Sequence, residues 1–166
     1  MKQTIATLLI ISFMLPSVAL AKVDSDKAAY FGGSVAEFAG AKDPVEGKLE
    51  ITDAAALVLH TSMHTLRIPY AKIEDLEYGQ KAGRRVGTAV GYTVLLGPLG
   101  LLTLFSKKRN HYLTVAYKDD SDKDQVAVLE LGKDIVRTTL PVVRTKSGKE
   151  ITFQDDEARK FAGMGK

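Results

Sequence analysis

An uncharged stretch of twenty residues, from Val86 to Phe105, limits what this chain can fold into more than any other feature of its sequence. Basic residues border it on both sides, at 84–85 and at 107–109. As an α-helix rising about 1.5 Å per residue, the stretch would be about 30 Å long, which matches the hydrocarbon core of a bilayer. We therefore interpret the segment as a membrane span, a re-entrant membrane hairpin, or a helical hairpin packed on a soluble domain.

Composition sets the broad class of protein. The chain has 166 residues, enough for one domain with appendages. With 45% hydrophobic and 26% charged residues, it has the composition of a folded chain with a packed core. The absence of Cys excludes disulfides, Cys-ligated zinc and a lipoprotein anchor. A net charge of +3, without basic stripes interleaved with aromatic residues, argues against nucleic acid as a partner.

Residues 1–21 have the pattern of a secretory signal peptide. Lys2 provides the positive start, an apolar run extends from Ile5 to Leu15, and Ala19 and Ala21 form a small-residue cleavage site. The run is short for a membrane span, which needs about 20 apolar residues. We expect cleavage after Ala21 and export to the periplasm or cell envelope. An uncleaved anchor is the alternative.

Short β-like segments make up most of the mature chain. Alternation and residue type predict strands at 28–38, 46–52, 56–60, 64–70, 72–79, 111–119 and 125–132. The glycines at 32–33 indicate a bulge, and Pro69 should end its strand or lie at a sheet edge. The polar run 119–124 predicts a hairpin turn. Periodicity leaves 72–79 open between a strand and a short helix.

The sequence changes character after residue 132. Asp134 is expected to cap a helix or to be an acid of its first turn, and Gly148 to stop it. One helical face would carry four apolar residues, Ile135, Val136, Leu140 and Val143. Pro141 opposes an undisturbed helix, since an internal proline costs about 3 kcal/mol. Residues 148–166 form a polar tail that is expected to fray beyond Phe153.

These segments carry a resemblance to a known family. The runs YFGGS, GKLEIT, ALVLH, LRIPYAKIEDLEYG, HYLTVAYKDD and VAVLELGKDIVRTTL resemble bacterial PH-like (pleckstrin-homology or GRAM-like) domains over residues 28–147. The resemblance implies a mainly β fold with a C-terminal helix, an antiparallel barrel of about seven strands, here interrupted by the apolar insertion 86–105 as a helical hairpin or transmembrane segment. PH-like barrels serve as lipid-binding, protein-binding or structural modules, so the resemblance assigns no residue role.

The place of the apolar segment in this order decides between a crossing and a hairpin. Five predicted strands precede it and two follow it, so a single crossing would put them on opposite sides of a membrane. Gly97-Pro98 offers a turn instead. It would separate an arm at 86–96, about 16 Å long, from a return arm at 99–106, about 12 Å long. We therefore expect the segment to leave and re-enter on one side.

Three groups of residues follow from the membrane interpretation. Apolar side chains would insert into the bilayer: Val86, Tyr92, Leu95, Leu96, Leu99, Leu101, Leu102, Leu104 and Phe105. Basic side chains would contact lipid headgroups: Lys81, Arg84, Arg85, Lys107, Lys108 and Arg109. Glycines spaced by four would let two helices approach closely, either the two arms or two subunits of a homo-oligomer: Gly83, Gly87 and Gly91.

The search for catalytic or metal-binding groups finds no coherent set. His60 and His64 are four apart, but they lie in a predicted hairpin, where this spacing does not converge on a metal. His111 borders the basic cluster and is assigned to the interface. Ser34 lacks the Gly-x-Ser-x-Gly elbow, and the acids at 119–124 lack the glycine and closing Glu of a calcium loop. We predict no enzyme activity, no cofactor and no metal.

Two functions remain. The first is an exported, membrane-associated PH-like binding or scaffold module of the cell envelope, with membrane lipid as its partner. The second is a soluble periplasmic carrier of a lipid or small apolar ligand. A need for detergent in purification would separate them.

Overall fold

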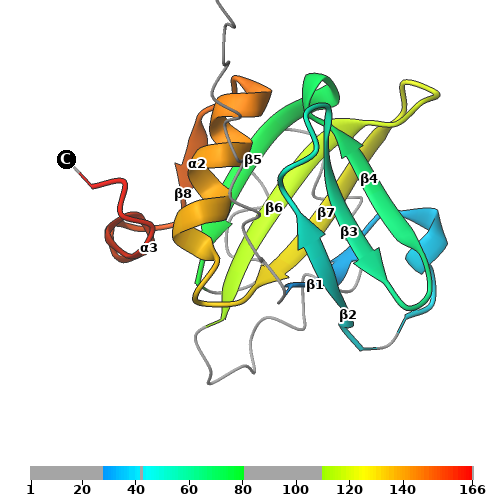
Figure 1. Cartoon of the computed structure of the whole chain (residues 1–166), viewed down its shortest axis with the longest axis horizontal. Helices are drawn as coiled ribbons and strands as arrows, with labels where there is room; N and C mark the ends of the chain where they lie inside the picture. The colour runs from blue at the N-terminus through cyan, green and yellow to red at the C-terminus, as the bar shows by residue number, and fades with distance from the viewer. Residues whose placement is uncertain (1–27, 42, 81–109, 166) are drawn as a thin grey trace, which may run out of the picture.

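The computed structural model describes residues 28–41, 43–80 and 110–165 (Figure 1). This part of the chain is mainly β. Its strands are β1 (Ala28–Gly33), β2 (Val45–Glu50), β3 (Ala56–Thr61), β4 (Thr65–Pro69), β5 (Ile73–Gly79), β6 (His111–Lys118), β7 (Asp124–Leu131) and β8 (Ile151–Phe153). The helices are α2 (Val136–Ser147) and α3 (Asp156–Phe161), with short 3-10 turns η1 (Ala36–Phe38) and η2 (Tyr70–Lys72).

All eight strands belong to one sheet, in the order β4-β3-β2-β1-β7-β6-β5-β8. Two antiparallel meanders, β1 to β4 and β5 to β7, are joined where β1 pairs with β7. The sheet curls into a half-barrel, and α2 lies against its concave side (Figure 1). The expected mainly β fold with a C-terminal helix is confirmed, and the segment left open at 72–79 forms a strand from Ile73 to Gly79. The eighth strand, which pairs parallel to β5, was not expected.

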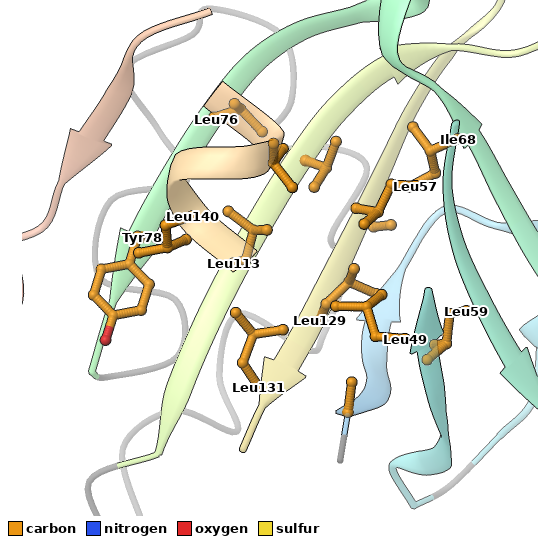
Figure 2. Close-up of a cluster of buried hydrophobic side chains, with 14 of the residues drawn as sticks. Leu49, Leu57, Leu59, Ile68, Leu76, Tyr78, Leu113, Leu129, Leu131 and Leu140 are labelled. Carbon is orange, nitrogen blue, oxygen red and sulfur yellow. The ribbon is translucent and has the colours of Figure 1, made fainter. Parts of the chain in front are cut away.

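The concave, inner face holds the main core. Side chains alternate along a strand, so Leu113, Val115 and Tyr117 of β6 point inward together. Figure 2 shows Leu113 and Leu129 from the sheet in one buried cluster with Leu140 from α2. Leu113, Val115, Leu129 and Leu140 are fully buried. At about 25 cal/mol for each Å² of apolar surface removed from water, this cluster is the dominant source of stability for the described fold.

The two predicted strand irregularities are present. The register between β1 and β7 shifts between Tyr30 and Gly32, which is the expected bulge. Gly33 has φ 139°, and a side chain there would overlap the carbonyl of Val126. Only glycine allows that backbone conformation and that close approach. Pro69 ends β4, an edge strand of the sheet, where its missing N–H costs no ladder hydrogen bond.

Helix α2 begins later than the sequence suggested. The prediction of Asp134 as its cap is wrong, because a turn in which the Ile135 N–H donates to Gly132 O (3.1 Å) delays the helix to Val136. Gly148 is confirmed as the stop, with φ 67° and its N–H donating to Arg144 O (2.9 Å). Pro141 lies inside the helix on its exposed side. Burial of the opposite face, Leu140 included, offsets the proline cost.

The expectation that the chain frays beyond Phe153 is wrong. Helix α3 follows β8, and its cap Asp155 accepts a hydrogen bond from the Ala158 N–H at 2.8 Å. Ala158 and Ala162 are buried against the core, so apolar contacts hold a segment whose composition is polar. In the described ranges, no helix has the length and hydropathy needed to cross a bilayer.

Candidate functional site

The predicted insertion, headgroup and helix-packing residues all lie between residues 81 and 109, outside the residues that the structure describes. The same holds for the predicted signal peptide, at 1–21. The structure does describe the two points at which the 81–109 segment joins the sheet. We call this end of the sheet the root, formed by Tyr78, Gly79, His111, Tyr112 and Gln154.

The two strands that lead into and out of the segment are neighbours. β5 and β6 pair antiparallel, with Tyr78 opposite Leu113 and Gly79 opposite Tyr112. These pairs are the last ones before the chain enters residues 81–109 and the first ones after it returns. Whatever path the segment takes, it therefore starts and ends at the same end of the same sheet.

A buried polar pair lies at the root. The Tyr78 hydroxyl and His111 Nδ1 are 2.7 Å apart, at hydrogen-bonding distance, and both side chains are buried. Burial raises the pKa of the Tyr78 hydroxyl. Burial also lowers the pKa of His111, and the charge of Lys133 adds to that effect. Both groups are thus held neutral near pH 7. His111 was assigned to the interface beside the basic cluster, and the structure places its side chain in this buried pair.

Aromatic rings from the C-terminal segment close around this pair. The ring of Phe161 stacks on His111 at 4.2 Å between centroids, and Phe153 meets Tyr78 edge-on at 6.1 Å. The Arg137 guanidinium of α2 lies 5.7 Å from the centre of the Phe161 ring, and its Nε donates to Phe161 O at 2.9 Å. The 151–161 segment therefore packs around the root. Its polar composition did not predict these contacts.

Backbone packing is also tight at this point. Gln154 N–H donates to Tyr78 O at 3.0 Å, and a Cβ placed on Gly79 would lie 2.6 Å from Gln154 Oε1. Gln80, His111 and Gln154 are three of the four buried polar residues of the described ranges. Since buried polar groups need fixed partners, their concentration here makes the root a rigid attachment rather than a loose hinge.

The root offers little chemistry beyond attachment. A phenol whose pKa is raised is a poor nucleophile, and the described contacts of His111 include no carboxylate to orient it as a base. The described ranges also contain no group of three His, Cys, Asp or Glu side chains placed to hold a metal ion.

The other histidines flagged by the sequence lie at the far side of the sheet. His60 Nε2 is 3.1 Å from Glu50 Oε2, and the His64 ring meets Phe38 edge-on at 5.9 Å. Both are exposed residues of the β3–β4 hairpin. The structure gives them separate partners and does not bring them together on one ligand.

The polar residues around the β6–β7 turn also have structural partners. Asp119 Oδ1 accepts hydrogen bonds from the N–H groups of Ser121 (2.8 Å) and Lys123 (3.0 Å), which closes the predicted hairpin turn. Ser34 Oγ donates to Gln125 Oε1 at 2.6 Å and accepts from Val126 N–H at 2.9 Å. These contacts hold the turn and the β1 bulge against β7.

The described fold and root define the class as a mainly β protein, built on a curled eight-stranded sheet with a C-terminal helix. The chain matches no protein-family model, and no curated protein matches it either.

Proposed function

We propose that this chain is an exported, membrane-associated binding or scaffold module of the cell envelope, without catalytic activity. A PH-like barrel would form its folded body. The apolar segment 86–105 would dip into one leaflet as a hairpin and hold that body at the membrane surface.

The pairing of Gly79 with Tyr112 carries the proposal. A helix that crossed the bilayer once would separate β5 from β6, so this pairing supports a path that leaves and returns on one side. Both basic borders, 84–85 and 107–109, then lie near the same sheet end, where each cation adds about 1 kcal/mol at an anionic surface. The rigid root suits a segment that transmits membrane binding to the barrel.

Two features support the PH-like part of the proposal. Two meanders join in one curled sheet, and α2 follows the last strand of the second meander and packs on the concave side. Strand β8 and helix α3 come after that helix and extend the simple PH-like plan. The carrier alternative receives less support, because the concave face is filled by the core, with Leu113, Leu129 and Leu140 fully buried.

Vesicle flotation of the purified mature chain tests the proposal. We expect the chain to float with vesicles of mixed neutral and anionic lipid, and to stay bound in 1 M salt because burial of apolar side chains is not screened. The double substitution Gly97→Asp with Leu101→Asp should abolish flotation, since each charge at membrane depth costs about 2–3 kcal/mol.

A matched control adds the same two charges elsewhere. Ser62→Asp with Met63→Asp changes the exposed β3–β4 turn, which several strands separate from the root in the sheet. This variant should float like the parent chain. Release of the parent chain by salt alone, or equal flotation of the two double variants, would show that the apolar segment does not insert.

A further inference from the structure

The convex, outer face of the sheet carries a second apolar cluster, separate from the core. We call it the outer patch: Phe31 of β1, Tyr112 and Ala116 of β6, and Val126 and Val128 of β7. Alternation along β6 and β7 turns these side chains away from the core. A one-layer sheet normally exposes such residues to water, yet Tyr112 is only 5% exposed and Val126 is fully buried.

Contacts within the outer patch explain only part of this burial. The rings of Phe31 and Tyr112 meet edge-on at 4.8 Å, and β7 lies between the strands that carry them. The contact with Phe31 does not by itself account for the burial of Tyr112. Among the described helices, α2 contributes Val136, Leu140 and Val143 to the inner core, and α3 packs beside β8. Neither supplies the second layer over the outer face.

The chain returns to the sheet on this outer face. Asn110 is the first described residue after 81–109, and its side chain lies close enough to the Tyr112 hydroxyl and the Glu130 carboxylate to influence the pKa of each. Tyr112 and Glu130 both point outward, because each is next to a residue that points inward. That residue is Leu113 for Tyr112 and Leu131 for Glu130. The segment that precedes Asn110 therefore starts from a residue that lies over the edge of the outer patch.

Charge at the border of the outer patch also fits this segment. Glu46 and Glu130 both lie opposite Ala29, on the strands either side of it, so their positions are about 10 Å apart. A hollow of about 400 Å³ lies here, lined by both carboxylates and by small residues, including Ala29 and Gly47. Burial raises the pKa of Glu130, and the charge of Glu46 adds to it, so a nearby cation would be stabilising. Residues 107–109, which are all basic, directly precede Asn110.

From these observations we infer that the outer patch is the docking surface for the chain's own apolar segment 86–105 when no bilayer is present. The segment supplies an uncharged surface of the kind that this face buries, and its basic border reaches the Glu46–Glu130 hollow. Docking removes two apolar surfaces from water at once, each worth about 25 cal/mol per Å². The inference goes beyond the proposed membrane role, because it concerns the chain in water.

Photo-cross-linking of the full mature chain, in water without detergent or vesicles, tests the inference. The photoreactive residue p-benzoylphenylalanine is introduced in place of Phe31, an aromatic residue at the border of the patch. Trypsin cuts after Arg85 and Lys107, so the segment is released as one peptide, 86–107. We expect cross-links to that peptide within a single chain. The same photoreactive residue at Thr65, exposed on the far edge strand β4, should give none.

The outcomes separate the candidate occupants. A cross-linked product of dimer size would assign the outer patch to a second copy, and a cross-link to residues before 28 would assign it to the N-terminal region. Either result, or no cross-link at all, overturns the inference. The Gly97→Asp with Leu101→Asp variant should lose the 86–107 cross-link, while Ser62→Asp with Met63→Asp keeps it. Since no lipid is present, failure of flotation and failure of cross-linking are independent results.

Discussion

The two faces of the sheet are both buried, but they are buried in different ways. The inner face is covered by α2 and holds the large core cluster. The outer face buries four residues, with Phe31 partly buried beside them, and no described helix covers them. The burial patterns of the strands reflect this difference. Strand β4 alternates between exposed and buried residues, as one-sided strands do, while β6 and β7 are buried almost continuously. Continuous burial of two neighbouring strands indicates a second layer.

The largest expected effect compares two valines on adjacent strands. Val115 points inward and Val126 outward, and both are fully buried. Val115→Ala should reduce the free energy of unfolding by about 2–3 kcal/mol, from lost transfer energy plus the cavity. Val126→Ala should cost about 1 kcal/mol, because its covering layer is docked rather than part of the core. Urea unfolding of both variants measures the difference.

Repeating the two unfolding measurements in detergent gives a second test of the difference between Val115→Ala and Val126→Ala. A mild micelle that draws the apolar segment away from the outer patch should decrease the Val126→Ala effect and leave the Val115→Ala effect unchanged. Equal effects of the two substitutions in both media would mean that the two faces are covered in the same way.

A smaller effect is expected at the root, where two buried tyrosines provide a matched pair. Tyr78→Phe leaves His111 Nδ1 without its partner, so the variant should lose about 2 kcal/mol of stability. The Tyr70 hydroxyl is also buried, but it has no hydrogen-bond partner among the described residues. Tyr70→Phe should therefore be neutral or slightly stabilising. A larger loss from Tyr70→Phe than from Tyr78→Phe in thermal or urea unfolding would contradict the assigned role of the pair.

The smallest effect is a pH dependence at His111. Because burial lowers its pKa, the unfolded chain binds more protons than the folded chain below the ordinary His pKa of about 6.5. The free energy of unfolding should fall as the pH decreases from 7.5 towards 5.5, by at most about 1.4 kcal/mol per pH unit from this group. His111→Gln should remove this part of the slope. Glu130, whose pKa is raised, contributes with the opposite sign in both proteins and cancels in the comparison.

Local sequence signals predicted most of the described fold. Alternation located β2 and β4, an apolar run located β3, the glycines at 32–33 marked the bulge, and Gly148 marked the end of α2. These features depend on residues a few positions apart, so a single sequence is enough to predict them. The paired strands on either side of the apolar segment also agree with the expectation that both belong to one sheet.

Features that depend on distant contacts were missed. Strand β8 is only three residues long, and it forms because it pairs with β5. The paired residues Ile151 and Leu76 are more than seventy positions apart in the sequence. His111 was assigned to the interface because it borders a basic cluster, and its contacts with the Tyr78 hydroxyl and the Phe161 ring could not be predicted from that position. The predicted site residues at 81–109 remain predictions, because they lie outside the described ranges.

Strand β8 has a consequence for how this chain tolerates truncation. Without Ile151–Phe153, β5 would be the last strand of the sheet, and its free N–H and C=O groups would accept a strand from another molecule. The opposite edge ends in a proline, which discourages such pairing. Proteolytic removal of the residues after 148 would therefore leave β5 as an exposed edge strand that can pair with another molecule. We expect such a truncated chain to aggregate more readily than the full chain.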